Sequence, residues 1–144
     1  DGTYSPEEIP LLISSLPKSG IVVGDRLHGN LELGAMTSTN WIGNHLLTWL
    51  AVSLHGTVIN DLCSGFWVFS KGAIKRLQLN SMRFEIEAEM YTSCVHQNIP
   101  IRQIPISYSK RVGEAKLGSI KDGTSIARKL IIRRIFPTPH EEKE

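Results

Sequence analysis

The stretch Ile21-Val22-Val23-Gly24-Asp25-Arg26 joins a short β-branched run to two charged residues. β-branched side chains favour strands, and a short continuous apolar run is consistent with a buried strand. The chain breaker Pro17-Lys18-Ser19-Gly20 precedes the run and separates it from what comes before. We therefore expect a buried strand over 21–24, whose end delivers Asp25 and Arg26 to a loop.

Capping and periodicity predict helices on both sides of this strand. Ser5 and Pro6 carry the signals of a helix start, so a helix is expected from there to about residue 16. Apolar residues recur at helical spacing from Thr37 to His55, where Gly56 supplies the stop. This is the longest helix that the sequence predicts.

The second half of the chain is expected to continue with short strands and helices. Residues 84–90 fit a strand as well as a helix by periodicity, and their good helix formers favour a helix to about residue 96. Pro105 lies inside an expected strand, so that strand should be an edge or contain a bulge. The other expected elements are strands over 58–59, 66–69 and 101–108, a short helix over 71–77, a polar loop over 109–119 and a basic helix from 122 to about 136.

The length of the chain indicates one ordinary domain, and the context of its cysteines indicates reduced thiols. The chain has 144 residues, enough to bury a core. Cys63 and Cys94 lie in apolar surroundings without a C-x-x-C pattern, which favours free thiols over a disulfide or a zinc site. No apolar run approaches the ~20 residues that span a bilayer, and no signal peptide is evident, so we expect a soluble or peripheral protein.

The charge is concentrated near the C-terminus. The formal net charge is +2, yet residues 110–134 contain eight basic and two acidic residues. Such a segment suggests partners that carry phosphate, and a solvated helix face is the alternative. Nucleic acid is not favoured as a partner, because the basic residues do not alternate with exposed aromatics.

A series of short motifs runs in order along almost the whole chain. Their order and spacing carry more information than any one of them. They are Asp1-Gly2-Thr3-Tyr4, Val22-Val23-Gly24-Asp25-Arg26, Gly34-Ala35-Met36-Thr37, Asn40-x-x-Gly43-Asn44, Asp61-x-x-Ser64-Gly65-Phe66, Phe84-Glu85-Ile86-Glu87-Ala88-Glu89-Met90, Ile104-Pro105-Ile106-x-Tyr108 and Arg111-x-Gly113-Glu114-Ala115-Lys116-Leu117.

In register, these motifs resemble those of family 2 glycosyltransferases of the GT-A type, in the form found in archaeal dolichyl-phosphate hexose synthases. The resemblance implies an α/β fold, namely the C-terminal half of a three-layer α/β/α domain with a mixed sheet flanked by helices. It implies a partial catalytic domain over 1–136 and a disordered acidic tail over 137–144. The N-terminal nucleotide-binding half would be missing, so we expect an exposed sheet edge, low stability and little activity of the isolated chain, unless a separate N-terminal half or a second copy completes it.

The function implied by the resemblance is transfer of a hexose from a nucleotide sugar to a dolichyl or other polyprenyl phosphate, with inversion. The enzyme would contact the cytoplasmic face of a membrane peripherally. The alternative is a remnant or subunit without catalytic activity that binds polyprenyl phosphate or membrane through its basic C-terminal segment.

The resemblance also assigns the charged residues of the site. Asp1 would hold a divalent cation, Mg²⁺ or Mn²⁺, which neutralises the departing diphosphate. Arg26, Arg111 and Lys116 match basic residues that contact phosphate, and guanidinium groups suit this because they bind phosphate in a fixed fork. Between Arg26 and Lys71 the chain has no Lys or Arg, so acceptor binding should rest on Arg26 and the 109–119 loop.

Three acidic residues complete the expected site. Asp61 would lie at the sugar and acceptor end of it, as a catalytic residue that orients the donor or assists deprotonation, and an Asx cap of its own turn is the equally weighted alternative. Glu87 and Glu89 match an acidic pair that binds substrate on the donor side or braces the basic loop. Glu85 and Glu89 should share a helix face from which Glu87 points away.

Overall fold

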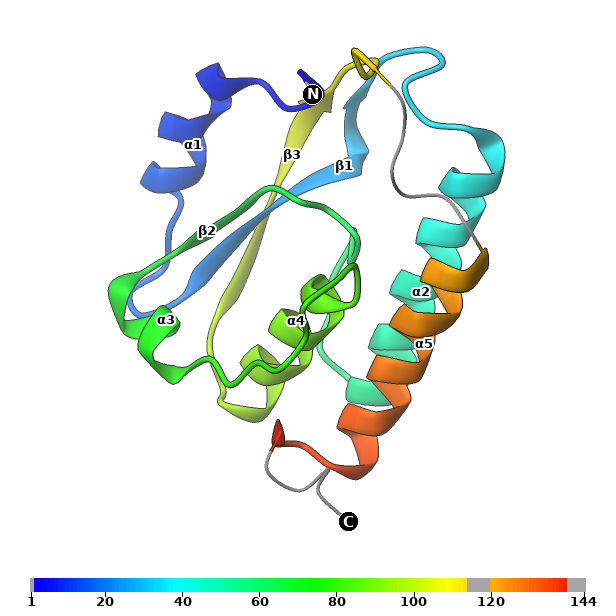
Figure 1. The fold of residues 1–144 in the computed structure, drawn as a ribbon. Coiled ribbons are helices and arrows are strands. Elements are labelled where there is room, and N and C mark those ends of the chain that lie inside the picture. The colour runs from blue at the N-terminus through cyan, green and yellow to red at the C-terminus, as the bar shows by residue number, and fades with distance from the viewer. Residues whose placement is uncertain (1, 114–119, 140–144) are drawn as a thin grey trace.

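The computed structural model describes residues 2–113 and 120–139 and has an α/β architecture (Figure 1). Its sheet has three strands in the order β2-β1-β3, with β1 antiparallel to β2 and parallel to β3. Helices cover both faces, so the expected mixed sheet within layers of helices is confirmed, and the arrangement is compatible with part of a GT-A fold. The elements are a 3-10 turn Pro6–Glu8, α1 Ile9–Ser14, β1 Ile21–Leu31, α2 Ser38–His55, β2 Trp67–Phe69, α3 Lys71–Arg76, α4 Ile86–His96, β3 Ile101–Tyr108 and α5 Ile120–Ile135.

The central strand β1 packs on both faces of the sheet, as the β-branched run predicts. Val22 lies with Leu12 of α1 and Ile106 of β3 in the core on one face. Ile21 and Val23 point to the other face, toward α3 and α4. A third apolar core fills the space between α2, α4 and α5. The sheet is therefore a middle layer between α1 and the helices on the opposite side.

The strand β1 is much longer than expected, because it continues through a bulge. Pairing with β3 resumes at Asn30 opposite Ser107 after a break that follows Asp25 opposite Pro105. Residues 26–29 thus lie opposite the single residue Ile106, and a Cβ on Gly29 would stand only 1.9 Å from the Ile106 carbonyl oxygen. The expectation that Asp25 and Arg26 lie in a loop was wrong: they belong to β1, and the bulge redirects the chain at this point.

Other expectations are met with small changes. The helix α2 begins after Thr37, whose hydroxyl accepts from Asn40 N, and ends at Gly56, which has φ 78°. Residues 86–96 are helical, and β3 is an edge strand that faces a bulge, which accommodates Pro105.

The expected strand over 58–59 does not form, since Ile59 is buried in the core between α2, α4 and α5 without joining a sheet. No helix among the described residues is long and apolar enough to cross a membrane.

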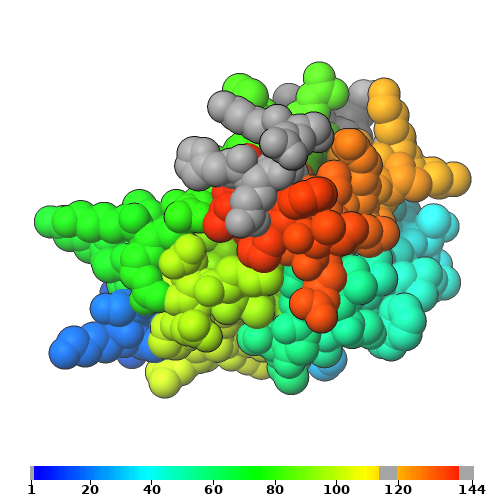
Figure 2. Space-filling model, turned by 90° about the horizontal axis from the view of Figure 1, so that it is seen from below, coloured from blue at the N-terminus to red at the C-terminus, as the bar shows by residue number. Residues whose placement is uncertain are grey.

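The C-terminal helix α5 is fixed to the body by buried polar contacts. Arg133 Nε and Nη2 donate to Glu89 Oε1 of α4 at 3.1 and 2.5 Å, and both side chains are almost fully buried. His55 Nε2 lies 3.0 Å from the Leu130 carbonyl oxygen, and His96 Nε2 lies 3.1 Å from that of Arg133. Figure 2 shows the end of α5 in red, between the end of α2 in teal and the turn after α4 in yellow-green.

The Glu89–Arg133 pair generates a stability prediction. Burial raises the pKa of Glu89, but hydrogen bonds from Arg133 and the 80–81 backbone outweigh it and lower the pKa below its ordinary 4.5. The pair therefore contributes stability above pH 4.5 that is lost as the pH falls further. Glu89→Gln leaves Arg133 buried without a counter-charge and should cost about 3 to 5 kcal/mol of unfolding free energy at neutral pH.

Urea denaturation as a function of pH measures this loss. Glu7→Gln is the matched control, because Glu7 is exposed and its substitution should change little. A Glu89→Gln protein as stable as the wild type would show that the pair does not hold α5.

Candidate functional site

Four of the sequence motifs meet beside the bulge of β1 and the C-terminal end of β3. Tyr4 forms an isolated antiparallel bridge with Tyr108, and Ser109 N donates to the Thr3 carbonyl oxygen. The Tyr4 hydroxyl accepts from Gly65 N at 2.8 Å, which ties the start of the chain to the turn after Asp61. Segments far apart in the sequence therefore form one site.

A buried ion pair between Arg26 and Asp61 lies at the centre of this site. Arg26 Nε donates to Asp61 Oδ2 at 2.7 Å, Nη2 donates to Oδ1 at 2.8 Å, and the Arg26 backbone N donates to Oδ2 at 3.0 Å. The two side chains are 8% and 0% exposed. Burial disfavours the charged guanidinium, but the hydrogen bonds and the charge of Asp61 outweigh it, so the pKa of Arg26 is raised and the group stays charged.

The pairing excludes one of the two interpretations of Asp61 and leaves its catalytic role a prediction. Both of its carboxylate oxygens accept from Arg26, and neither accepts from its own turn, so Asp61 is not an Asx cap. It orients Arg26 instead. The Nη1 atom of Arg26 makes no hydrogen bond to any residue between 2 and 113 or 120 and 139.

One aromatic ring packs on the guanidinium, and a second ring packs between that ring and a third. The Arg26 Cζ atom lies 5.2 Å from the centre of the Tyr108 ring, in cation–π geometry. Tyr4 contacts both Phe66 and Tyr108 edge to face, with ring centroids 5.3 and 5.2 Å away. Burial raises the pKa of Tyr4, although the nearby Arg26 charge opposes this, so its hydroxyl remains a neutral hydrogen-bonding group.

Glu87 and Glu89 have different surroundings. Burial raises the pKa of Glu87, and the charge of Arg26 partly opposes the rise, so its carboxyl group lies within electrostatic reach of the site. Glu89 is fully buried and pairs with Arg133 of α5, outside the 109–119 loop that it was expected to brace, so its assignment to the substrate site stays a prediction. The two side chains therefore point in different directions, as the helix spacing predicts.

Cys63 lies beside the ion pair as an unreactive thiol. Burial and the neighbouring Asp61 carboxylate raise its pKa to about 12. A thiol that stays protonated at neutral pH is a poor nucleophile. Both Cys63 and Cys94 are free, as expected from the sequence.

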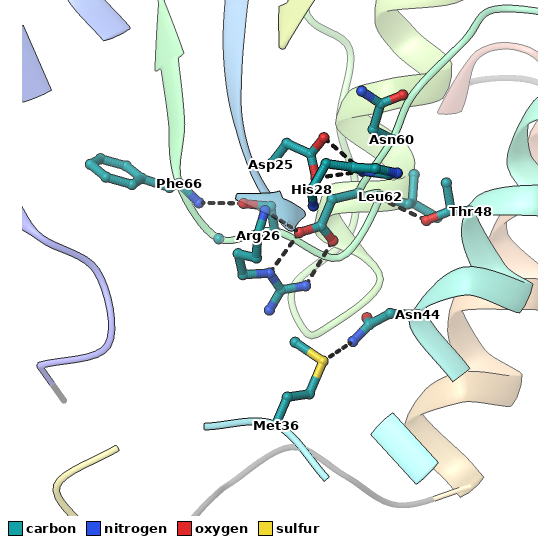
Figure 3. Close-up of polar contacts among 12 residues, drawn as sticks. Asp25, Arg26, His28, Met36, Asn44, Thr48, Asn60, Leu62 and Phe66 are labelled. Carbon is teal, nitrogen blue, oxygen red and sulfur yellow. Dashed lines mark hydrogen bonds and ion pairs between the residues drawn. The ribbon is translucent and has the colours of Figure 1, made fainter. Parts of the chain in front are cut away.

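Asp25 and His28 form a second polar pair that sequence reasoning did not identify as a site. The Asp25 carboxylate lies 2.9 Å from His28 Nδ1, at the same bulge that carries Arg26. Figure 3 shows Asp25, Arg26 and His28 grouped at the bulge of β1, on the side of the strand where Asn44 and Thr48 of α2 lie. A carboxylate three residues before a histidine at the end of a strand was the available signal.

Two predicted site residues, Asp1 and Lys116, lie outside the described residues. Arg111 is described and half-buried, three residues after the end of β3. Among residues 2–113 and 120–139, no group of three or more His, Cys, Asp or Glu side chains could hold a metal ion. This part of the chain therefore supplies no metal site of its own, and the assignment of Asp1 stays a prediction.

Comparison with known proteins places the chain among archaeal relatives. It is 33% identical over 136 residues to the low-salt glycan biosynthesis hexosyltransferase of Haloferax volcanii, covering 92% of the chain and 33% of that protein. It is 30% identical to glycosyltransferase AglJ of the same organism, covering 92% of the chain and 45% of that protein. It is 31% identical over 110 residues to the UDP-N-acetylglucosamine–dolichyl-phosphate N-acetylglucosaminyltransferase of Methanococcus voltae, covering 74% of the chain and 44% of that protein.

The chain thus spans less than half the length of each of these relatives. No protein-family model matches it, and no solved structure matches it significantly.

The Arg26–Asp61 pair should show strong energetic coupling. Removing either partner leaves the other charge buried, so Arg26→Met and Asp61→Leu should each cost about 3 to 5 kcal/mol of unfolding free energy. The double variant replaces the pair with apolar side chains and should lose less than either single variant. Urea denaturation of the four proteins measures the coupling, and additive losses would contradict it.

Proposed function

The chain is a homologue of archaeal glycosyltransferases, and we propose that it takes part in transfer of a hexose from a nucleotide sugar to a polyprenyl phosphate such as dolichyl phosphate, with inversion. The names of the relatives support this, since one is a hexosyltransferase and another acts on dolichyl phosphate. The observation that carries the proposal is the guanidinium of Arg26, which Asp61 holds by two hydrogen bonds at the bulge of β1, with Nη1 left to bind a phosphate oxygen.

The proposed role of Arg26 follows from this geometry. A phosphate monoester carries charge near neutral pH, because its second pKa is about 6, so it is already a nucleophile. Such an acceptor needs a cation that positions it. Asp61 fixes the guanidinium plane, and the ring of Tyr108 supports it from one face. Positioning of this kind lowers the barrier because the reacting atoms are held in line.

The positive charge of Arg26 alone is insufficient to bind the acceptor phosphate, because the Asp61 carboxylate balances it. Arg111 stands near the end of β3 and begins the basic segment, so we assign it the second contact with the acceptor phosphate, with Lys116 as a third. Glu87 is assigned to the donor side. Asp1 would hold a Mg²⁺ or Mn²⁺ ion, which would supply the positive charge that neutralises the leaving diphosphate.

Peripheral contact with the cytoplasmic face of a membrane is also part of the proposal. The acceptor is a lipid, so the enzyme must meet it at a bilayer surface. Large apolar side chains are exposed along α2, which supports such a contact: Trp41, Ile42, Leu46 and Trp49. Tryptophan is a residue that favours the membrane interface.

Acceptor binding is tested with a soluble monoester, geranyl phosphate, titrated by ³¹P NMR. Arg111→Ala should weaken binding roughly 10- to 150-fold, as expected for loss of a charge-assisted bond of about 1.5 to 3 kcal/mol. Lys75→Ala is the matched control, since it removes one positive charge from exposed α3 and should leave the affinity unchanged. Equal weakening in both variants would indicate a general charge effect without a phosphate site.

Sugar transfer is tested with radiolabelled nucleotide sugars and dolichyl phosphate, on this chain and on a form extended at its N-terminus. We expect product from the extended form, and loss of product when a chelator removes divalent cations. Binding of geranyl phosphate without any transfer by the extended form would favour the alternative of a non-catalytic subunit.

A further inference from the structure

The pair formed by Asp25 and His28 has the geometry of a positioned proton acceptor. Asp25 is 1% exposed, and its carboxylate lies 2.9 and 3.1 Å from His28 Nδ1. The same carboxylate accepts from the His28 backbone N at 3.1 Å. An ionised carboxylate only accepts hydrogen bonds, so Nδ1 must carry a proton and donate it. The neutral ring therefore has its lone pair on Nε2.

The far edge of the His28 ring is open to a ligand. Its side chain is 56% exposed, although its partner Asp25 is almost fully buried. Nε2 lies on the side of the ring away from Nδ1, and it makes no hydrogen bond to residues 2–113 or 120–139. The ring lies edge to face with His45, with centroids 6.3 Å apart, and Trp41 packs on His45 at 4.1 Å.

The charges around the bulge of β1 link protonation of His28 to phosphate binding. Arg26 is balanced by Asp61, and Asp25 adds a buried negative charge with no Lys or Arg hydrogen-bonded to it in the described part of the chain. A phosphate dianion brought to Arg26 would meet this negative charge. Protonation of His28 would cancel it and add a donor, Nε2–H, on the exposed side of the ring, so binding of phosphate and protonation of His28 should favour each other.

We propose that His28, oriented by Asp25, takes the last proton of the bound phosphate monoester through Nε2 and then holds the phosphate as an imidazolium. This rests on the proposed function and deepens it by naming a further catalytic residue. The phosphate O–H bond breaks and the proton moves to Nε2, which leaves a dianionic phosphate. A phosphate oxygen then attacks the anomeric carbon of the nucleotide sugar, and the bond from that carbon to the diphosphate breaks. The diphosphate leaves with the electron pair, and Nε2 later returns its proton to solvent.

The groups around His28 are consistent with this role. Asp25 contacts its Nδ1 atom from β1, and the His45 ring contacts it edge to face from α2. The Arg26–Asp61 pair beside it is neutral as a unit. The dependence of binding on pH should therefore follow the shared proton of His28 and phosphate.

The first measurement requires no ligand. Long-range ¹H–¹⁵N NMR of the histidine rings should show neutral His28 with its proton on Nδ1, and Asp25→Asn should weaken this preference by removing the charged acceptor. A neutral His28 protonated on Nε2 would overturn the proposal whatever the function of the chain.

The second measurement is proton uptake on binding of geranyl phosphate at pH 7, from calorimetry in two buffers with different ionisation enthalpies. The wild type should take up protons, because free phosphate and free histidine together hold less than the one proton that the complex retains. His28→Gln should abolish this uptake. His96→Gln is the matched control, since it removes a histidine that contacts α5 and keeps a donor for the Arg133 carbonyl, so uptake should persist.

The outcomes separate the two proposals. Binding with unchanged proton uptake in His28→Gln would overturn the role of His28 and leave the proposed function standing. Absence of binding of geranyl phosphate to the wild type would overturn the proposed function and this inference with it, even where NMR finds the Nδ1 tautomer. His28 is mostly exposed, so its substitution should not unfold the chain.

Discussion

The buried ion pair of Arg26 and Asp61 is the interaction on which the site depends. Moving two charges out of water costs several kcal/mol for each ion, and this pair offsets the cost with two side-chain hydrogen bonds and one from the backbone. The bulge at 26–29 makes the pairing possible, because it turns Arg26 out of the regular ladder with β3. The pair then fixes the turn after Asp61, on which Gly65 meets Tyr4. The Arg26–Asp61 pair thus joins the strand to the turn, and the Tyr4–Gly65 hydrogen bond joins the turn to the start of the chain.

A second buried pair, Glu89 with Arg133, changes the interpretation of the basic C-terminal segment. Its excess of positive charge is not all available to a partner. Arg133 is neutralised inside the protein, and Lys129 is mostly buried, with Nζ 3.9 Å from Glu89. Part of the basic helix is therefore an anchor, and the proposed attraction of phosphate would rest on the remaining basic residues, among them Arg111. Arg111 follows the end of β3, beside which the Arg26 site lies.

Local signals in the sequence predicted the helices and the run that forms the centre of β1. The helix α2 has the Thr37 cap and the Gly56 stop that its sequence indicates, because capping depends on neighbours along the chain. The full length of β1 was not predictable, since charged residues after a glycine resemble a turn, and their burial depends on a partner 35 residues away. The strand expected over 58–59 was wrong for a related reason. Ile59 is apolar because it packs in the core between helices, and no strand pairs with it. The sequence indicated Arg26 and Asp61 separately as site residues. Their pairing depends on the tertiary fold, which the spacing of the motifs does not predict.

The charge of the phosphate during the proposed reaction connects the two polar pairs. The acceptor enters with up to two negative charges, and the product is a phosphodiester with one. A site with one internally balanced cation, Arg26, and one proton-dependent cation, His28, favours the more highly charged species, because its net charge rises when His28 is protonated. After transfer the product neutralises less of the imidazolium, which then loses its proton to solvent more readily and leaves the buried Asp25 charge facing the product. The same pair that assists binding of the acceptor would thereby weaken binding of the glycosylated lipid and favour its release.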